Sequence, residues 1–337
     1  MVRGLFACLV FGLLLSCSEP SREVALTGPA MGTTYTVKAL VPPGIETATL
    51  RVAIDDVLAR IDRQMSSYRS DSEISRFNAS PSTDWMPVSA ELANLVDRTR
   101  AISEASGGAL DITVAPLVDL WGFGPAGERK GVPTAEEIEA ARGQIGYRHV
   151  EVQLEPHALR KANSTVRVDL NAVAPGYAVD ALAARLTSRG ITRFMVELGG
   201  EVIARGVNAE GRAWRIAVER PFDTRSQPYA ILKLHDASVA TSGEYRHYYS
   251  YEGHRYSHTI DPRTGRPVEH SAGAVVVIAG TTFEADAWAT AFNVLGPDEG
   301  QALAQQRGMP VMFILRDGAR LEPRMTPEFE KYVAVGP

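Results

Sequence analysis

Few cysteines and no excess of positive charge narrow the classes of protein that this sequence can encode. The 337 residues include two cysteines, Cys8 and Cys17. Cys8 lies in an apolar N-terminal run. Removal of that run as a signal peptide leaves Cys17 alone, which excludes an internal disulfide and a thiolate metal site. Any metal then needs oxygen or imidazole ligands. The formal net charge of −5 gives no basic face, so we expect no nucleic-acid partner.

The glycine-rich motifs of the common nucleotide-binding folds are also missing. There is no Walker A motif, and Gly199-Gly200 neither has the spacing of a dinucleotide fingerprint nor opens a helix. Taken alone, this pair predicts a hairpin turn. An acidic chain of this kind could bind a pyrophosphate only with local help from a metal ion or from backbone N–H groups.

The N-terminus indicates export and lipid attachment. Residues 4–15 are almost wholly apolar, too few to span a bilayer but suited to the core of a signal peptide. The run ends in Leu14-Leu15-Ser16-Cys17, which resembles a bacterial lipobox, whose cysteine becomes the acylated first residue. We expect a signal peptide over 1–16, then acylated Cys17 and a tether over 17–27. The protein would be anchored to a bacterial membrane, with the inner membrane favoured, and face the periplasm. An ordinary secretory signal with an incidental cysteine is the alternative.

Hydrophobic periodicity predicts helices and strands without a regular βαβ alternation. The predicted helices cover about 50–65, 89–105, 134–143, 176–188, 281–295 and 298–307. The predicted strands cover about 35–41, 193–198, 201–204, 214–219, 230–234, 274–278, 310–315 and 320–323. This mixture predicts an α+β fold with largely antiparallel sheets packed with helices. Residues 28–337 would form the folded domain, as one body or as two lobes.

One predicted helix carries a pair of oxygen ligands. Thr281 and Glu284 form a capping-box pattern, and Asp286 and Thr290 follow on the same helix, four residues apart. Their side chains therefore lie on one face. A carboxylate and a hydroxyl together suit a hard cation such as Mg²⁺. The alternative is that Asp286 interacts with the helix dipole and Thr290 only packs.

Two other positions are typical of ligand contacts. Asp169 follows an apparent strand and precedes a turn into a helix, which is a usual place for a binding loop, although it could simply cap the turn. Tyr68 lies in the polar stretch 65–78, where a flat ligand could stack on its ring. A surface loop capped by its own serines is the alternative for that stretch.

A histidine precedes a turn that is rich in polar residues. His258 is expected on a short strand just before the turn 261–265, which reads Asp-Pro-Arg-Thr-Gly. The neighbouring Ser257, Thr259 and Asp261 could set the tautomer of its ring and tune its pKa. A lone histidine is more often an ordinary polar residue, and these neighbours distinguish His258 from that case.

Taken in order, these segments resemble the ApbE family, the FAD:protein FMN transferases once described as thiamine-biosynthesis lipoproteins. The resemblance covers about residues 28–325 and is most specific at Ser257–Gly265. The lipobox is similar to that of the family as well. The matching segments are Ala30–Tyr35, Met65–Arg69, Gly108–Val114, Asp169–Gly176, Glu197–Gly200, Ala240–Gly243, Ser257–Gly265 and Ala285–Thr290.

The resemblance implies Mg²⁺-dependent transfer of FMN from FAD to a threonine hydroxyl of an acceptor protein, with release of AMP. Subunits of redox-driven ion pumps are candidate acceptors. His258 would be the catalytic base. Asp286 and Thr290 would bind Mg²⁺ with their side chains, and Ala172 with its backbone carbonyl. The residues implied to contact FAD are Met31, Tyr68, Ala109, Leu110, Asp111, Asp169 and Ile260.

Three positions depart from the pattern of the family. Pro175 stands where relatives often carry a Lys or Glu that reaches the cofactor, Ala172 where some have Thr, and Ala289 where some have a second Asp. These changes could weaken cofactor or metal affinity without removing activity. The alternatives left open are a FAD pyrophosphatase, a non-catalytic FAD-binding lipoprotein and a structural envelope lipoprotein.

Overall fold

An antiparallel eight-stranded sheet forms the centre of the computed structural model, which describes residues 21–124, 127, 129, 131–221, 228–243, 248–318 and 320–336. The strand order is β1-β2-β6-β7-β10-β15-β16-β17, and every neighbouring pair is antiparallel. The strands are β1 (Arg22–Ala30), β2 (Thr33–Val41), β6 (Phe194–Leu198), β7 (Glu201–Arg205), β10 (Ala237–Gly243), β15 (Ala272–Ala279), β16 (Val311–Asp317) and β17 (Arg320–Met325).

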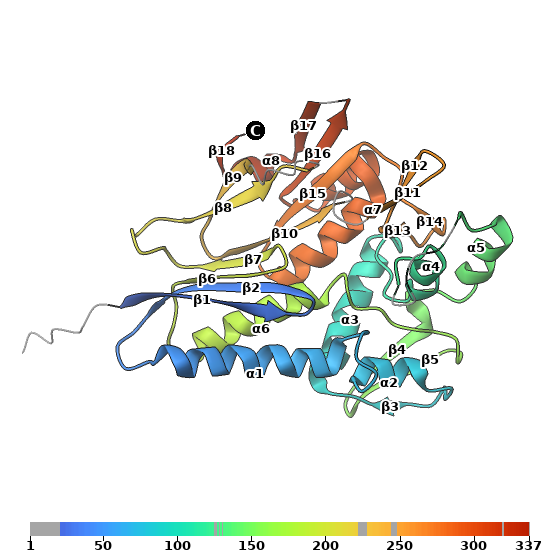
Figure 1. Ribbon diagram of the computed structural model, residues 1–337, viewed down its shortest axis with the longest axis horizontal. Coiled ribbons are helices and arrows are strands. Elements are labelled where there is room, and N and C mark those ends of the chain that lie inside the picture. The colour runs from blue at the N-terminus through green and yellow to red at the C-terminus, as the bar shows by residue number, and fades with distance from the viewer. Residues whose placement is uncertain are drawn as a thin grey trace, which may run out of the picture.

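Helices cover one face of this sheet and a small sheet covers the other (Figure 1). Because successive side chains of a strand point to opposite faces, Val196 and Leu198 join the core on the helix side, whereas Met195 packs into the second core on the small-sheet side. The helices are α1 (Thr47–Met65), α3 (Ala90–Ala105), α6 (Ala174–Thr187) and α7 (Thr282–Gln306). The small sheet has the order β18-β9-β8, with β8 (Trp214–Glu219), β9 (Pro228–Leu234) and β18 (Val333–Val335), and α8 (Pro327–Glu330) lies nearby.

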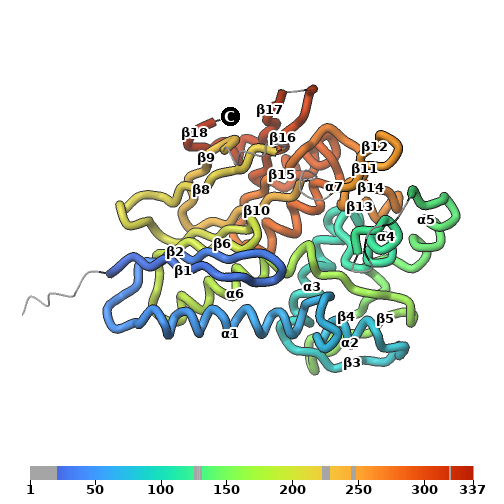
Figure 2. Tube along the Cα trace, viewed as in Figure 1, coloured from blue at the N-terminus to red at the C-terminus, as the bar shows by residue number. Residues whose placement is uncertain are grey.

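Short elements complete the fold at the end of the molecule near α3 and the middle of α7 (Figure 2). The helical ones are α2 (Glu73–Ala79), α4 (Ala115–Leu120), α5 (Ala135–Arg142) and the 3₁₀ turn η1 (Tyr147–His149). The strands are β3 (Met86–Pro87), β4 (Val150–Leu154), β5 (His157–Lys161), β11 (Tyr248–Tyr251), β12 (His254–Ser257), β13 (Ile260–Asp261) and β14 (Arg266–Pro267).

The predicted α+β class is confirmed, and the local signals explain several elements. The apolar spacing of residues 50–65 buries one side of α1. The turn at Gly199-Gly200 joins β6 to β7, with Leu198 opposite Glu201. Thr134 and Glu137 form the predicted capping box of α5. In the part of the chain that the structure describes, no helix combines the length and the apolar character needed to cross a membrane.

Three expectations need correction. The range 17–27 was expected as a tether, but β1 begins at Arg22, so the sheet starts inside that range. The predicted signal peptide and Cys17 lie outside the described residues.

The strand predicted before Asp169 does not form, because the side-chain amide of Asn78 makes both hydrogen bonds to the backbone of Val168. His258 lies between β12 and β13 rather than on a strand.

Candidate active site

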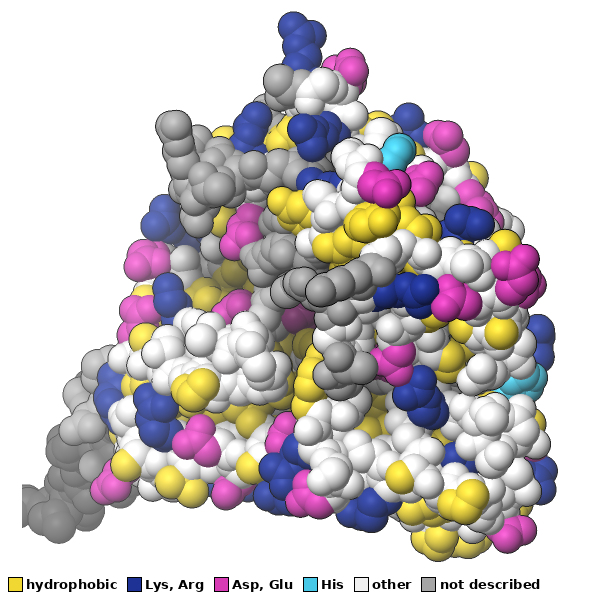
Figure 3. All heavy atoms as spheres, turned by 45° about the vertical axis from the view of Figure 1, so that its right-hand side comes forward, with side chains coloured by type: hydrophobic (Ala, Val, Ile, Leu, Met, Phe, Trp, Pro, Cys, Tyr) yellow, Lys and Arg dark blue, Asp and Glu magenta, His cyan; other side chains and the backbone are white. Residues whose placement is uncertain are grey.

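A cavity of about 840 Å³ lies where α7, the β6–β7 turn and the loops after α3 meet. Figure 3 shows the surface of this side of the molecule hollowed near its centre. The cavity wall brings together nearly all the predicted site residues, although they come from distant parts of the chain. They are Tyr68, Ala109, Leu110, Asp111, Asp169, Ala172, His258, Ile260, Asp286 and Thr290.

Met31 is the predicted FAD contact that the cavity wall does not include. It occupies the turn between β1 and β2 with a positive φ of 49° and packs against the core on the helix side. Thr33, two residues further on and the first residue of β2, lies against Gly199. Met31 is therefore near the hairpin that borders the cavity but is not part of the described wall.

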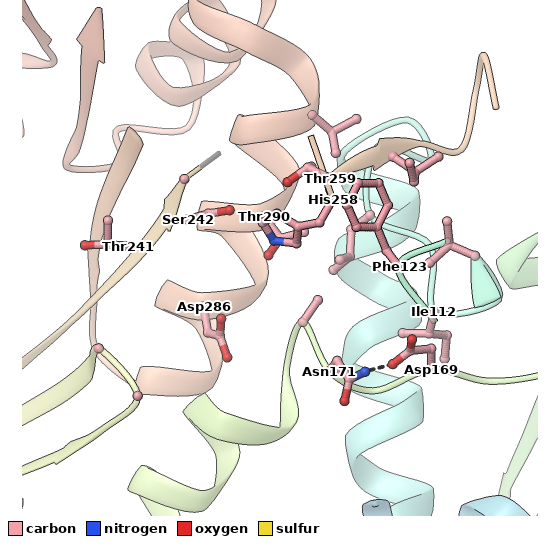
Figure 4. A pocket seen from close by; sticks show the side chains of 18 of the residues that line it. Ile112, Phe123, Asp169, Asn171, Thr241, Ser242, His258, Thr259, Asp286 and Thr290 are labelled. Carbon is pink, nitrogen blue, oxygen red and sulfur yellow. Dashed lines mark hydrogen bonds between the residues drawn. The ribbon is translucent and has the colours of Figure 1, made fainter. Parts of the chain in front are cut away.

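Helix α7 presents a stripe of side chains to the cavity. Asp286, Thr290 and Val294 line it at intervals of four residues, as the helical period requires (Figure 4). The first turn of α7 is held twice: the Thr281 hydroxyl accepts from the Glu284 N–H, and the Asp180 carboxylate on α6 accepts from two further N–H groups of α7, at 2.8 and 2.9 Å. Asp286 and Thr290, the two candidate metal ligands, therefore stand on a fixed helix end.

Asp286 is buried and short of positive partners. Its Oδ2 accepts a hydrogen bond from the Gly176 N–H at 2.9 Å, and no described Lys or Arg forms an ion pair with it. Burial raises its pKa well above the usual range, and the charges of Glu201 and Asp180 raise it further. The close approach needs glycine, since a Cβ on Gly176 would lie 2.7 Å from the Asp286 Cβ. A cation here would relieve this excess of negative charge.

The oxygen atoms around Asp286 suit a hard cation. Thr290 lies one helical turn further along α7, and Ala172 lines the same cavity from the loop that leads into α6. A carboxylate, a hydroxyl and a backbone carbonyl match the preference of Mg²⁺ for oxygen and for few protein ligands. Among the described residues, no three His, Cys, Asp or Glu side chains cluster in a way that could hold a metal.

His258 faces the same cavity from the other side of α7 (Figure 4). Its ring packs edge-on against Phe123, with centroids 6.4 Å apart. The adjacent Thr259 N–H donates to the Ser257 hydroxyl. Asp261, which was expected to tune the histidine, accepts from the backbone N–H and the Nε of Arg263 at 2.8 and 3.0 Å. Aromatic packing therefore contributes to the placement of the imidazole.

Asn293 organises the site, and sequence reasoning missed it. It is fully buried one turn after Thr290, and its Nδ2 donates to the Ser242 and Thr259 hydroxyls, both at 3.2 Å. It thereby ties α7 to β10 and to the residue next to His258. A polar residue in the apolar run before Gly296-Pro297 was the available signal.

His270 supplies the hydrogen bond that the backbone of α7 lacks at the Asn293 carbonyl. Pro297 has no N–H to offer the Asn293 carbonyl four residues earlier, and Gly296 breaks the helix with a φ of 75°. His270 Nε2 lies 2.6 Å from that carbonyl. Because His270 Nδ1 accepts from the Ala272 N–H, Nε2 is the protonated nitrogen and donates. Burial lowers the pKa of His270, which favours this neutral form.

Asp111 and Asp169, two of the other carboxylates of the wall, differ in their bonding. Asp111 accepts three hydrogen bonds, from the N–H and hydroxyl of Thr113 and from the Tyr147 N–H, at 2.7, 2.6 and 2.8 Å. Asp169 accepts one from the Asn171 N–H at 2.8 Å, which Figure 4 draws as a dashed line. Burial raises the pKa of both carboxyls. Asp111 therefore joins two loops, and Asp169 keeps more free acceptor capacity.

Tyr68 is the most open of the predicted contacts. Its side chain is 72% exposed at the rim of the cavity, so a ring could stack on it without displacing a protein group. Ile260, in contrast, is buried in the wall.

Sequence reasoning also missed Phe123 and the lining residues on the small-sheet side of the central sheet. Only the three-dimensional structure shows that they share a cavity with the predicted residues.

Together, the fold and the cavity define a class: an α+β protein in which a buried carboxylate, a half-buried hydroxyl and a half-buried imidazole could serve a metal-assisted polar reaction. The model of the ApbE family matches residues 31–313, and the chain belongs to that family. The FAD:protein FMN transferase of Vibrio cholerae is 40% identical over 96% of both chains, and that of Escherichia coli K12 is 39% identical over 94% of this chain and 91% of its own.

Solved structures agree with this assignment. The flavin transferase ApbE from Vibrio cholerae superposes with a TM-score of 0.85 at 40% identity, covering 93% of this chain and 100% of that one. The apo form of the Pseudomonas stutzeri flavinyl transferase ApbE gives a TM-score of 0.86 at 40% identity, covering 94% and 99%. The similarity therefore extends over the described fold and is not confined to one motif.

Proposed function

We propose that this chain is a FAD:protein FMN transferase that requires Mg²⁺. A threonine hydroxyl of an acceptor protein attacks the phosphorus of the FMN half of FAD. An oxygen–phosphorus bond forms, the pyrophosphate bond breaks, and AMP leaves. The family and the names of the relatives support this reaction. The observation that carries it is the shared cavity of Asp286, Thr290 and His258.

The metal would be held by residues of one corner of the cavity. The side chains of Asp286 and Thr290 and the carbonyl of Ala172 supply oxygen, and the nearby Glu201 adds negative potential. When bound, Mg²⁺ would offset the charge of the diphosphate and stabilise charge that develops on the phosphoryl oxygens. Ala289 does not line the cavity and its methyl group is buried in the core, so it adds no ligand there.

The acceptor hydroxyl needs a base, because threonine is a poor nucleophile at neutral pH. The imidazole of His258 would take its proton, a contribution typically worth about 10²–10⁴-fold. Asn293 and the aromatic wall hold the segment that carries this ring. Tyr68 offers an exposed ring for stacking by a flat ligand.

Pro175, which departs from the pattern of the family, lies in the first turn of α6. A proline is tolerated at that position, so it destabilises the helix little.

The test is mass spectrometry of a candidate acceptor after incubation with the protein, FAD and Mg²⁺. We expect an FMN adduct on a threonine, no adduct with excess EDTA, and recovery when Mg²⁺ is added back. His258→Ala should abolish the adduct while FAD still binds, as measured by quenching of flavin fluorescence. Adduct formation that is insensitive to EDTA would contradict the metal assignment. AMP and free FMN released rapidly without acceptor would indicate a pyrophosphatase instead.

The proposal includes the location of the enzyme. The apolar run before Cys17 and the short distance in sequence to β1 support a lipid anchor at Cys17, with the domain in the periplasm beside the inner membrane. Subunits of redox-driven ion pumps are the proposed acceptors. Cys17→Ala should move the protein from the membrane fraction to the soluble fraction and stop incorporation of labelled palmitate. Unchanged fractionation and labelling would argue against acylation at this residue.

A further inference from the structure

The cavity extends over both faces of the central sheet. On the helix side, it is lined by Asp286 and Thr290 of α7. Its wall also includes Met195 and Val202, whose side chains belong to the core between the central sheet and the small sheet. Residues of opposite faces can line one cavity only where it passes beyond the ends of the strands. The cavity therefore has a second compartment on the small-sheet side.

The passage between the compartments is bordered by glycine. Gly199-Gly200 and Gly243 line the cavity at the strand ends, and a Cβ placed on Gly200 would meet no atom within 4 Å. The Glu197 carboxylate accepts from the Gly200 N–H at 3.1 Å and so fixes the turn. In Figure 4, the side chains of Thr241 and Ser242 leave β10 on opposite sides, and both residues line the cavity. The reacting centre is thus reachable from behind the sheet.

Strand β8 forms one wall of this second compartment with its edge. It is the last strand of the small sheet and, among the described residues, pairs only with β9. Arg215, Ile216 and Ala217 are consecutive and all line the cavity. Since neighbouring side chains of a strand point to opposite faces, a cavity that meets all three must run along the strand edge. No strand of the described residues pairs with that edge, and an unpaired strand edge offers N–H and C=O groups to which another strand can bind.

We propose that the acceptor protein docks here: the segment that carries its threonine lies extended along the edge of β8, and the hydroxyl reaches through the glycine-bordered passage toward His258. This inference builds on the proposed function. Main-chain pairing with a free edge is a general way to bind an extended peptide. This compartment is lined by two carboxylates, Glu197 and Glu219, and one guanidinium, Arg215. Its excess of negative charge favours an uncharged peptide backbone over an anionic diphosphate as the occupant. FAD would then occupy the helix side.

The test is a bulky side chain on the edge of β8. Ala217 is exposed, so Ala217→Trp should fold and fill the compartment. We expect kcat/KM for the acceptor protein to fall at least about tenfold, while the Kd for FAD changes less than about twofold. Lys233→Trp is the matched control, because Lys233 is exposed on the adjacent β9 but does not line the cavity. It should leave both constants unchanged.

A second measurement localises the contact directly. An acceptor peptide with a photoreactive residue beside its threonine should cross-link to residues 214–219 in the unmodified protein. Transfer that survives Ala217→Trp, or cross-links that fall only elsewhere, would overturn the docking site alone. An equal loss of FAD affinity would assign the compartment to the cofactor. No transfer by the unmodified protein would overturn the proposed function, and the docking site with it.

Discussion

Two buried aspartates in the wall of the same cavity have opposite surroundings. Asp111, in the loop after α3, accepts three hydrogen bonds from the protein. Asp286, at the start of α7, accepts one, from Gly176, and lies near the negative charges of Glu201 and Asp180. Both carboxyls have raised pKa values because of burial. The spacing from Thr290 had suggested a metal ligand for Asp286, and the resemblance to the family had implied a FAD contact for Asp111.

The difference teaches that the number of protein donors separates a structural carboxylate from one that awaits a ligand. A buried carboxylate with three donors has little acceptor capacity left, and its removal leaves the donors unpaired. A buried carboxylate with one donor and like charges around it is unfavourable until a cation arrives. By this criterion, we expect Asp111 to hold the site together and Asp286 to take part in its chemistry.

The largest effect should come from Asp286→Asn. The amide can still accept from Gly176, but it lacks the charge that the metal requires. We expect FMN transfer to fall by about 10²–10³-fold, the loss typical of removing one strong electrostatic group from an active site. Steady-state transfer at saturating FAD and Mg²⁺ measures it. A variant that retains most of its activity would break the comparison at its main point.

Asp111→Asn should act on stability instead. Its NH₂ group would face the N–H of Thr113 or of Tyr147, so one buried donor loses its acceptor. We expect the free energy of unfolding to fall by about 1–3 kcal/mol, while the folded variant keeps its transfer rate within a few-fold. Urea denaturation and transfer assays on the same preparation check both halves. A large loss of kcat without loss of stability would make Asp111 a ligand contact after all.

Asn293→Ala should give a smaller catalytic effect. It removes the links to Ser242 and Thr259 and thereby loosens the segment that carries His258. Losing the positioning that about one hydrogen bond provides should lower kcat roughly tenfold. The Kd for FAD should change little. Asn293→Gln is the conservative comparison, since it keeps the amide on a longer side chain. Equal losses of FAD affinity and kcat would point to general damage rather than to positioning.

The smallest expected effect is a pH dependence of the free energy of unfolding. The native pKa of Asp286 lies above its ordinary value of 3.8, so the native state keeps a proton that the unfolded chain has released. Above about pH 4, the unfolded state therefore binds fewer protons, and the stability of the metal-free protein falls as pH rises toward the native pKa. Asp286→Asn should flatten that decline. Urea midpoints measured in EDTA from about pH 4 to pH 8 would reveal it; parallel curves would contradict the assignment.

The sequence predicted what depends on local spacing. The shared face of Asp286 and Thr290, the hairpin turn at Gly199-Gly200 and the cap at Thr281 each follow from a few adjacent residues. The α+β class followed from the mixture of helical and alternating patterns. The polar neighbours of His258 made it a candidate, and the resemblance to the family implied its role as the base. The structure places it in the same cavity.

What depends on distant partners could not be predicted in this way. The strand expected before Asp169 is absent because Asn78, far away in the chain, bonds to the backbone of Val168. The compartment behind the sheet is lined by Met195 of β6, Val202 of β7 and residues of β8, which only the packing of the small sheet brings together. Counting the donors around Asp111 required the position of Tyr147. No periodicity carries such information.

Under the proposed acylation of Cys17, the early start of β1 at Arg22 would limit how far the enzyme can reach. Only five residues of chain lead from Cys17 to Arg22, and fully extended they cover at most about 18 Å. With the proposed acyl chain in the bilayer, the edge of the central sheet is kept at a nearly constant height above the lipid surface. Flavin would then be delivered to proteins that present their threonine close to that same surface, and freely diffusing proteins would have to come down to it.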